Sequence, residues 1–406
     1  MTTLTRFDVI VVGGGIAGSV LGGVLARAGY GVLVLEKEAA FRDRVRGEST
    51  WSYAVADALA MNLQSLFDQA GIVDITGVRR YQGGQEISCY RWAEDAIDGL
   101  PEIGFLHPRF QEAAWQWAAA QGAVMQRPAK AVAFSRNGAS VLTAVVDGEE
   151  RSFHSTLVVG ADGKHSQARR WTGGETGSDP EHHRFGGVLV NGVSTPDRDT
   201  DNVCRTGREA VNWFAAGPDH TRLYVLMTAA RLRETGVDRS FERLIDYARP
   251  AMPAGALDEV EQAGPIGFFA NNDTWATCIS ANGVTLVGDA AGAPDPSQGH
   301  GTSLIYHDIR ALTERLLASP PSQWERATAN YAAHRAAYFD VVRAYDAWEC
   351  LIGHEPGPDA DRLREGHARA KDADSTLGGF ANLEAQGPDG LVADEAARRH
   401  YFGEDL

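Results

Sequence analysis

The stretch DVIVVGGGIAGSVLGGVLARAGYGVLVLE, residues 8–36, decides the fold class of this chain. It begins with a β-branched run at 8–12, which predicts a strand buried on both faces. Three glycines interrupt that run, and residues 16–28 then have helical spacing with small residues among the apolar ones. A second apolar run, 31–35, ends at Glu36. The stretch therefore predicts a β-α-β unit at the start of an α/β protein.

The turn inside this unit carries a nucleotide-binding pattern. Gly13, Gly15 and Gly18 satisfy G-x-G-x-x-G between the predicted strand and helix. Gly13 permits the tight turn, Gly15 lets a phosphate approach, and Gly18 lets the helix pack closely on the strand. Glu36 stands 21 residues after Gly15, where a carboxylate accepts both hydroxyls of an adenosine ribose. The pattern predicts a dinucleotide site without separating FAD from NAD, and two neighbours are expected to contribute to it: Ala17 and Lys37.

The composition is that of a globular chain with two or three domains. The 406 residues are 44% hydrophobic and 23% charged, which is enough apolar material for a large core. The net charge of −16 disfavours binding to nucleic acid or to an anionic membrane surface. Four scattered cysteines and the lack of a long apolar run predict a reduced, cytoplasmic chain without structural zinc or a membrane-spanning helix.

A second stretch narrows the choice of cofactor. STLVVGADGKHSQARRW, residues 155–171, runs from a predicted strand into Asp162 and Gly163, with Ser166 and Arg169 beyond. It matches the pattern D-G-x-x-S-x-x-R. On this pattern the chain resembles the FAD-dependent aromatic hydroxylases related to para-hydroxybenzoate hydroxylase, the group A flavoprotein monooxygenases.

A third stretch agrees with that resemblance. NGVTLVGDAAGAPDPSQGHGTSLIYHDIRALTERL, residues 282–316, contains a strand, Gly288 and Asp289, a Pro/Gly loop and a helix. It resembles the G-D-A-A-x-x-x-x-P-x-x-G-x-G segment of the same family. The resemblance implies that Asp289 binds the ribityl chain of FAD and that the following helix start faces the flavin pyrimidine. The amides at that start favour negative charge near flavin N1 and O2, and three residues supply them: Gly301, Thr302 and Ser303.

Further cofactor contacts are implied by position in the family pattern. Arg46, within the segment 44–48, takes the place of an arginine that reaches the FAD pyrophosphate, with a solvated basic loop as the alternative. His107 precedes a predicted helix where relatives place Arg or Gln against the cofactor, a departure from the pattern. Asp162 and Val132 complete the expected set.

The resemblance also implies the domain plan. It predicts an α/β protein with a Rossmann-like FAD-binding domain, an inserted antiparallel or mixed β-sheet substrate domain and a helical C-terminal region. Their expected limits are 1–77, 100–180 and 276–330 for the first, 78–99 and 181–275 for the second, and 331–406 for the third. Helices are predicted at 50–70, 110–121, 241–251 and 331–351, and strand-like segments at 78–92, 185–193, 210–216, 221–228 and 266–275. The alternation in 221–228 suits a strand with one core face and one more polar face.

The chemistry implied by the resemblance is monooxygenation. NADH or NADPH reduces FAD, O₂ adds to give a flavin C4a-hydroperoxide, and an electron-rich aromatic or polycyclic molecule is hydroxylated. Pro296 matches a proline whose backbone orients substrate and peroxide. His300 is a candidate acid or base if its pKa is near neutral, with a surface histidine as the alternative. An aromatic pocket is the other candidate feature, with core packing as the alternative for most of its members: Trp213, Tyr224, Phe268, Phe269, Asn271 and Asn272.

Departures from the pattern keep other functions in view. Gly292 stands where the family usually has histidine, and GDAAGAPDP at 288–296 also resembles flavin-dependent halogenases and geranylgeranyl-reductase-like enzymes. The halogenase pattern W-x-W-x-I-P is absent, and epoxidation, N-oxidation or a non-enzymatic sensing module are further alternatives. The motifs are compatible with a separate flavin reductase and with a monomer or a homodimer. His182 and His183 predict a solvated turn and no metal site, because no carboxylate or cysteine stands at a ligand spacing.

Overall fold

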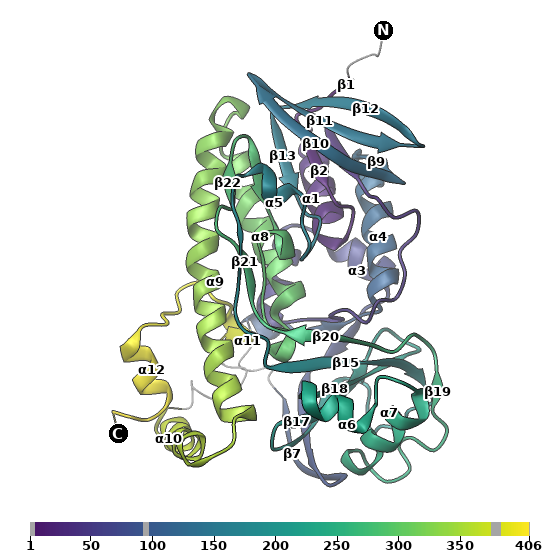
Figure 1. The fold of residues 1–406 in the computed structure, drawn as a ribbon, viewed down its shortest axis with the longest axis vertical. Coiled ribbons are helices and arrows are strands. Elements are labelled where there is room, and N and C mark those ends of the chain that lie inside the picture. The colour runs from purple at the N-terminus through teal and green to yellow at the C-terminus, as the bar shows by residue number, and fades with distance from the viewer. Residues whose placement is uncertain (1–4, 92–96, 375–382, 406) are drawn as a thin grey trace.

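The computed structural model describes residues 5–91, 97–374 and 383–405. Its first layer is a six-stranded sheet, parallel except at one edge strand (Figure 1). In spatial order the strands are β22 (Ser280–Ala281), β23 (Val284–Leu286), β13 (Leu157–Gly160), β2 (Val9–Val12), β3 (Val32–Leu35) and β9 (Val124–Gln126). The predicted β-α-β unit is thereby confirmed, and all three quoted stretches meet at neighbouring strands.

Helix α1 (Ile16–Arg27) lies between this sheet and α4 (His107–Ala120). Its glycines explain how closely the layers approach. A Cβ at Gly22 would lie 2.6 Å from the Val34 side chain, and one at Gly23 would lie 2.3 Å from Trp117. The small residues of the helix are therefore needed on both of its covered faces.

A second, antiparallel sheet follows α4 and is not predicted by any motif. It consists of β10 (Ala129–Asn137), β11 (Ala139–Val146) and β12 (Glu149–Ser155), and β1 (Thr5–Arg6) pairs in parallel with β12 at its edge. The predicted helix at 50–70 is two helices, α2 (Ser52–Ala60) and α3 (Gln64–Ala70). Asn62 between them has φ +55°, a left-handed conformation that an α-helix cannot continue through.

An eight-stranded mixed sheet forms the other large layer (Figure 1). Its β6 and β16 pair in parallel although more than a hundred residues separate them, and the other pairs are antiparallel. The strands are β6 (Gly77–Gln82), β7 (Gln85–Arg91), β15 (His183–Asn191), β16 (Thr200–Thr206), β17 (Glu209–Ala215), β18 (Thr221–Thr228), β19 (Glu261–Gln262) and β20 (Gly267–Asn271). The predicted mixed α/β fold class is confirmed.

Strand β18 differs from its expected pattern. Leu223, Val225 and Met227 face a core that includes Leu244 of α7 (Phe241–Ala248). The opposite face is more polar, as expected, since it carries Arg222 and Tyr224, yet all residues from 221 to 227 are buried. Both faces are covered because the second one lies against residues 43–48 and the cavity described below. The predicted segment 266–275 likewise divides into β20 and β21 (Thr274–Ala276).

The C-terminal quarter is helical where it is described. Helix α8 (His300–Leu317) packs on α9 (Trp324–His354), which begins before the predicted position 331. Figure 1 shows α9 running past the six-stranded sheet toward the eight-stranded one, with the last helices at its far end. These are α10 (Pro358–Ala373), α11 (Leu383–Gln386) and α12 (Glu395–Tyr401). Within the described ranges, every helix is too short or too polar to cross a lipid bilayer.

Candidate active site

A single elongated cavity of about 1070 Å³ extends from the glycine turn, past the start of α8, to the C-terminal helices. This volume exceeds the upper end of the range of roughly 300–1,000 Å³ found for small-molecule sites, so there is room for a dinucleotide and a second molecule. The predicted residues that line it are Gly13, Gly15, Ala17, Glu36, Lys37, Arg46, His107, Asp162, Asp289, Pro296, Gly301 and Thr302. Four others do not line it: Gly18, Val132, His300 and Ser303.

The glycine turn has two kinds of glycine. Gly13 has φ +102°, and a Cβ there would lie 2.4 Å from the Ala161 carbonyl oxygen. A Cβ at Gly18 would lie 1.8 Å from the Gly13 oxygen, so Gly18 serves the close packing expected of it and does not face the cavity. At Gly15 a Cβ would meet only the Gln111 amide nitrogen, at 3.6 Å. The space in front of Gly15 is therefore open cavity, as a phosphate at a helix start requires.

Glu36 holds this turn in place. Its Oε2 accepts a hydrogen bond from the Gly14 amide at 2.8 Å, and its Oε1 accepts one from the Glu38 amide at 2.8 Å. The side chain is 7% exposed and lines the cavity. Because each carboxylate oxygen can accept a second hydrogen bond, Glu36 can also accept ribose hydroxyls.

The residues of the second motif stretch, 155–171, mainly hold the third stretch, 282–316, in position. The Asp162 carboxylate accepts a hydrogen bond from the Ser166 hydroxyl at 2.5 Å and from the backbone at the start of α5 (Ala168–Trp171). Arg169 is buried and donates to the carbonyl oxygens of Asp289 and Ala290, each at 3.0 Å. The D-G-x-x-S-x-x-R pattern thus builds a clamp on the loop that carries Asp289.

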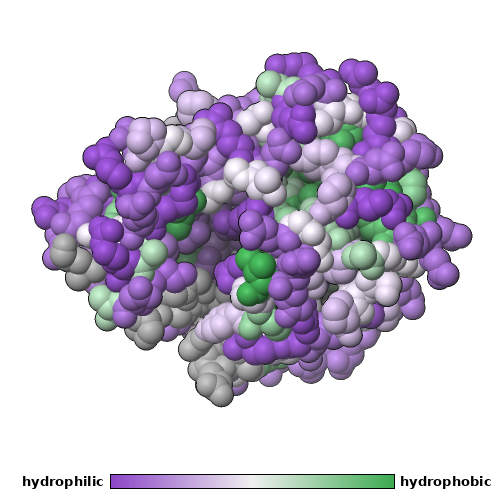
Figure 2. Space-filling view, turned by 90° about the horizontal axis from the view of Figure 1, so that it is seen from below, coloured by the Kyte–Doolittle hydropathy of each residue, from purple (hydrophilic) through white to green (hydrophobic). Residues whose placement is uncertain are grey.

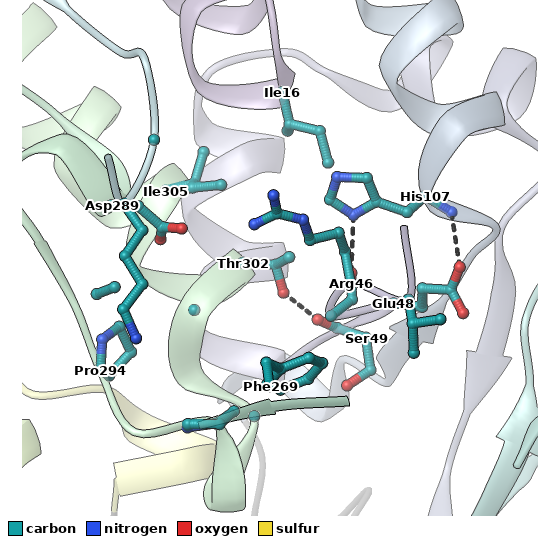
Figure 3. Close-up of a pocket in the computed structure, with 18 of the residues that line it drawn as sticks. Ile16, Arg46, Glu48, Ser49, His107, Phe269, Asp289, Pro294, Thr302 and Ile305 are labelled. Carbon is teal, nitrogen blue, oxygen red and sulfur yellow. Dashed lines mark hydrogen bonds between the residues drawn. The ribbon is translucent and has the colours of Figure 1, made fainter. Parts of the chain in front are cut away.

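The Asp289 carboxylate faces the cavity, and the Arg46 side chain points toward it from the other side (Figure 3). Burial raises the pKa of Asp289, and the positive charges of Arg46 and Lys164 counteract that shift. Within the described chain, no hydrogen-bond donor contacts this carboxylate. A partly buried carboxylate without a donor among the described residues can accept hydrogen bonds from the hydroxyl groups of a ribityl chain.

Arg46 is positioned by a buried ion pair that the sequence motifs do not predict. Arg222 of β18 donates from Nε to Glu48 Oε2 at 2.6 Å and from Nη2 to Glu48 Oε1 at 2.9 Å. The Tyr224 hydroxyl donates to the Arg46 carbonyl oxygen. An arginine as the second residue of a mostly apolar strand is the one sequence signal for this contact. The second sheet thereby holds the segment that presents Arg46.

His107 contacts the same segment, residues 44–48, and its imidazole ring is neutral. Its Nδ1 lies 2.9 Å from the Gly47 carbonyl oxygen, and its backbone amide donates to Glu48 at 3.1 Å. Burial lowers the pKa of His107 to about 4. The ring therefore contributes hydrogen bonds to the cavity wall, where an arginine would have contributed charge.

The start of α8 is tied to β4 (Ser49–Thr50), which follows that segment. The Thr302 hydroxyl donates to the Ser49 carbonyl oxygen, and the Ser303 hydroxyl accepts from the Trp51 amide at 2.9 Å. Ser303 is buried and outside the cavity lining, so its side chain serves this attachment. A Cβ at Gly301 would meet nothing within 4 Å, which leaves the helix start open to the cavity.

His300 does not have the properties expected of an acid or base. It is completely buried, stands outside the cavity lining, and its Nε2 lies 3.4 Å from Asp346 Oδ1. Burial lowers the pKa of His300 to about 3. The expectation of a near-neutral pKa is wrong, and so is the alternative of a surface histidine, because α9 covers this end of α8.

The eight-stranded sheet gives the cavity an aromatic wall. Tyr224, Phe268 and Phe269 line it as predicted, and Phe185 and Phe214 join them. The Phe185 and Tyr224 rings stack with centroids 4.6 Å apart. Phe185 and Phe214 share a sheet face with Tyr224, a relation set by strand register, which the sequence alone does not supply.

The other three pocket candidates lie elsewhere. Trp213 is buried on the opposite face of the sheet, against Tyr81. Asn271 donates to Asp295 and Ser297, and Asn272 donates to Ser178. All three are outside the cavity lining, which corrects the expectation that they face substrate.

The histidine pair is also differently placed from what was expected. His182 Nε2 lies 2.9 Å from Asp295 Oδ2, and Cys350 brings its sulfur within 4.8 Å of both. These three residues could hold a metal ion. The expected solvated turn is wrong for His183, which is buried at the start of β15. The sequence spacing did not reveal the carboxylate and the thiol beside His182, because residues remote in sequence supply both. The hydrogen bond from His182 to Asp295 already pairs these two groups.

Comparison with known proteins agrees with this geometry. The family model described as FAD binding domain matches residues 6–72 and 106–338. The chain belongs to this family. It is 26% identical to digeranylgeranylglycerophospholipid reductase 1 of Methanococcoides burtonii, over 81% of this chain and 82% of that protein. It is 27% identical to rifampicin monooxygenase of Streptomyces venezuelae, over 88% of this chain and 74% of that protein.

Among solved structures, a triple variant of the flavin-dependent brominase Bmp2 has a TM-score of 0.75 and 17% identity. The alignment covers 98% of this chain and 99% of that one, so the whole fold is shared. The family match confirms FAD as the cofactor and confirms the resemblance to flavoprotein oxidoreductases of the hydroxylase and monooxygenase type. The residues lining the cavity near Gly15 and Asp289 fit that cofactor.

Proposed function

We propose that this chain is an FAD-dependent monooxygenase that uses NADH or NADPH and O₂ to hydroxylate an aromatic or polycyclic small molecule. The observation that supports this most is the continuity of the cavity. It joins the glycine turn and Asp289, which suit FAD, to the aromatic wall around Tyr224. A cofactor and a flat apolar substrate can therefore occupy one continuous space.

Bound FAD supplies the hydride acceptance and oxygen activation, so the chain itself has to bind, orient and shield. Gly15 and the start of α8 at Gly301 offer backbone amides to the cofactor, and Glu36 and Asp289 offer acceptors for its hydroxyls. Phe185 and Phe269 orient an aromatic ring by stacking and edge contacts. Pro296 lines the passage between these two regions.

A short chain of hydrogen bonds offers a route for protons between the cavity and solvent. The Ser297 hydroxyl lines the cavity and donates to Asp295 Oδ1 at 2.5 Å. The other oxygen of Asp295 lies 2.9 Å from His182 Nε2, and the His182 side chain is 35% exposed. Hydrogen bonding to Asp295 raises the pKa of His182. This route takes the place expected of His300.

Two other activities are alternatives with support of their own. The 26% identity to digeranylgeranylglycerophospholipid reductase 1 favours double-bond reduction. The shared fold with a flavin-dependent brominase, C-terminal helices included, favours halogenation. Each differs from hydroxylation in what it adds to the substrate.

The test therefore reads the product. FAD-loaded protein is reduced without oxygen by NADH or NADPH, then mixed with isotopically labelled O₂ and a panel of aromatic compounds. Oxygen label in a product supports the proposal. Bromide or chloride incorporation indicates a halogenase, and addition of hydrogen without oxygen indicates a reductase. A purified protein that takes up no FAD, or that forms none of these products while releasing only hydrogen peroxide, overturns the proposal.

A further inference from the structure

The far end of the cavity has a different character from the aromatic wall. It lies where β6 and β16 of the eight-stranded sheet meet the C-terminal helices. Figure 2, a view from below, shows the molecule hollowed near the centre of this face, with hydrophilic residues around much of the opening. The acidic and basic residues that line this end are Arg80, Asp201, Arg205, Glu349, Arg364, Lys371 and Glu384.

Two of these arginines lie side by side on one face of the sheet. Arg80 of β6 is the register partner of Val203 in β16, and Arg205 is two residues farther along the same strand. Residues two apart in a strand face the same side, so Arg80 and Arg205 share the side that carries the aromatic wall. Both side chains are exposed to the cavity.

Neither guanidinium is paired with a described residue. Within the described residues, Arg80 and Arg205 form no ion pair and no hydrogen bond. Their neighbour Arg79, on the opposite face of β6, contacts Glu86 and Asp197 at 2.6 Å each. Arg364 is also committed, since its Nη1 donates to the carbonyl oxygens of Ile352 and Glu355. An unpaired arginine is uncommon where carboxylates are near, which sets Arg80 and Arg205 apart.

The chain leaves room for these side chains. A Cβ at Gly353, next to the last residue of α9, would lie 2.8 Å from Arg205 Nη1. Any larger residue there would displace the guanidinium. The helix that closes this end of the cavity is therefore shaped around Arg205.

Three of the nearby acids have a raised pKa, which favours their neutral form and weakens their effect on the two arginines. Burial raises the pKa of Asp201 to about 7 and that of Glu384 to about 8. Burial also raises the pKa of Glu102 well above its usual value. Burial and the charge of Arg205 lower the pKa of Arg80, and they outweigh the opposite effect of the Glu349 and Asp201 carboxylates. Glu349 accepts a hydrogen bond from the Tyr401 hydroxyl, which orients it toward the C-terminal helices.

We propose that Arg80 and Arg205 form a subsite for a carboxylate group at one end of the substrate, whose aromatic ring rests on the wall around Tyr224. This inference rests on the proposed function, because it extends the same cavity. Two neighbouring guanidinium groups match the two oxygens of a carboxylate, and charge-assisted hydrogen bonds of this kind are strong. A phosphate ester has the same oxyanion chemistry, so the test has to separate the two.

The test uses calorimetry on the FAD-loaded protein, which needs no turnover. The probes are phenylpropanoate, phenylpentanoate and phenyloctanoate, with their primary amides and the phosphate esters of the corresponding alcohols. At one or more chain lengths the acid should bind about tenfold or more tightly than its amide. Arg80→Gln and Arg205→Gln should each reduce that preference to within about threefold.

Arg208→Gln is the matched control. Arg208 lies beyond the end of β16, contacts Glu355 at 2.9 Å and does not line the cavity. Its variant removes the same charge from the same region and should keep the full preference. If Arg208→Gln loses the preference for the acid to the same extent, the effect comes from the net charge of the region, and the subsite is overturned.

The remaining outcomes are equally decisive. If no acid binds more tightly than its amide, the subsite is overturned. If only the phosphate esters show the preference, the carboxylate assignment is overturned. An acid preference in a protein that oxygenates nothing leaves the subsite standing while the proposed function fails. Oxygenation of a substrate without any preference for the acid supports the proposed function and overturns the subsite.

Discussion

Arg222 and Glu48 form a bidentate ion pair in which both side chains are fully buried, with N–O distances of 2.6 and 2.9 Å. A third group, Asp43, contacts Arg222 at 3.0 Å. The pair joins β18 of the eight-stranded sheet to the segment that carries Arg46 into the cavity. It therefore connects the wall expected to bind substrate with the wall expected to bind FAD.

Replacing Arg222 by methionine should destabilise the protein strongly. The Glu48 carboxyl would stay buried without its cation, and breaking such a pair costs about 3–5 kcal/mol. Burial raises the pKa of Glu48 even with Arg222 present, so the variant should also bind a proton on folding at higher pH. Chemical denaturation of wild type and Arg222→Met measures the loss, and FAD retention should fall with it.

A surface pair is the control for that prediction. Arg249 and Asp258 lie 2.9 Å apart with side chains about half and two-thirds exposed. Arg249→Gln should cost less than about 1 kcal/mol. Equal losses in the two variants would contradict a special role for the buried pair.

Alanine substitutions at Gly13 and Gly15 should have different effects, one on folding and the other on cofactor binding. Gly13→Ala places a Cβ 2.4 Å from a carbonyl oxygen at φ +102°, so it should destabilise the fold. Gly15→Ala meets no close protein atom, so the free energy of unfolding without cofactor should stay within about 1 kcal/mol of wild type. FAD affinity, measured by equilibrium dialysis, should nevertheless fall in Gly15→Ala, because the methyl group occupies the phosphate's space. Unchanged affinity would place the phosphates elsewhere.

Removing the Asp289 carboxylate should weaken FAD binding. Asp289→Ala loses an acceptor for the cofactor's hydroxyl groups, and hydrogen bonds to a charged group contribute about 1.5–3 kcal/mol, or roughly tenfold or more in affinity. Asp289→Asn should lie between wild type and alanine. Asp219→Ala, in an exposed turn, is the control and should bind FAD normally. Wild-type affinity in Asp289→Ala would contradict its assignment.

His307 should make stability depend on pH. Its Nδ1 lies 2.7 Å from Asp57 and its Nε2 lies 3.5 Å from Asp389. Burial lowers the pKa of His307, but the two carboxylates outweigh burial and raise it to about 9 from 6.5. A raised folded-state pKa contributes stability below the unfolded value that is lost as pH rises through the folded one.

The measurement compares the free energy of unfolding of wild type and His307→Gln. Their difference should be largest below pH 6.5 and should shrink by up to about 3 kcal/mol as pH rises to 9. His400→Gln, which removes a half-exposed contact to Asp374, should show little of this change. A difference that stays constant with pH would mean that His307 is neutral in the folded protein.

The fold and the cofactor end of the site were largely predictable because their signals are local. The strand at 8–12, the glycine turn and the strand before Asp289 each lie within a short stretch whose periodicity and turn residues set the backbone. The substrate end was less predictable. Phe185 and Phe214 join the aromatic wall through strand register, and Trp213 leaves it for the same reason, since neighbouring residues in a strand face opposite sides.

The amino-acid sequence by itself determined that three separate stretches form parallel strands that end at one cavity, because hydrophobic periodicity and glycine chemistry act over a few residues. Only the tertiary structure decided which charges meet. Arg222 and Glu48 are 174 residues apart, and α9 buries His300 and lowers its pKa. It also decided that Arg80 and Arg205 lie beside the cavity without a partner among the described residues. The physical reason is that burial and pairing depend on which surfaces pack together, and charge energetics follow from burial and pairing.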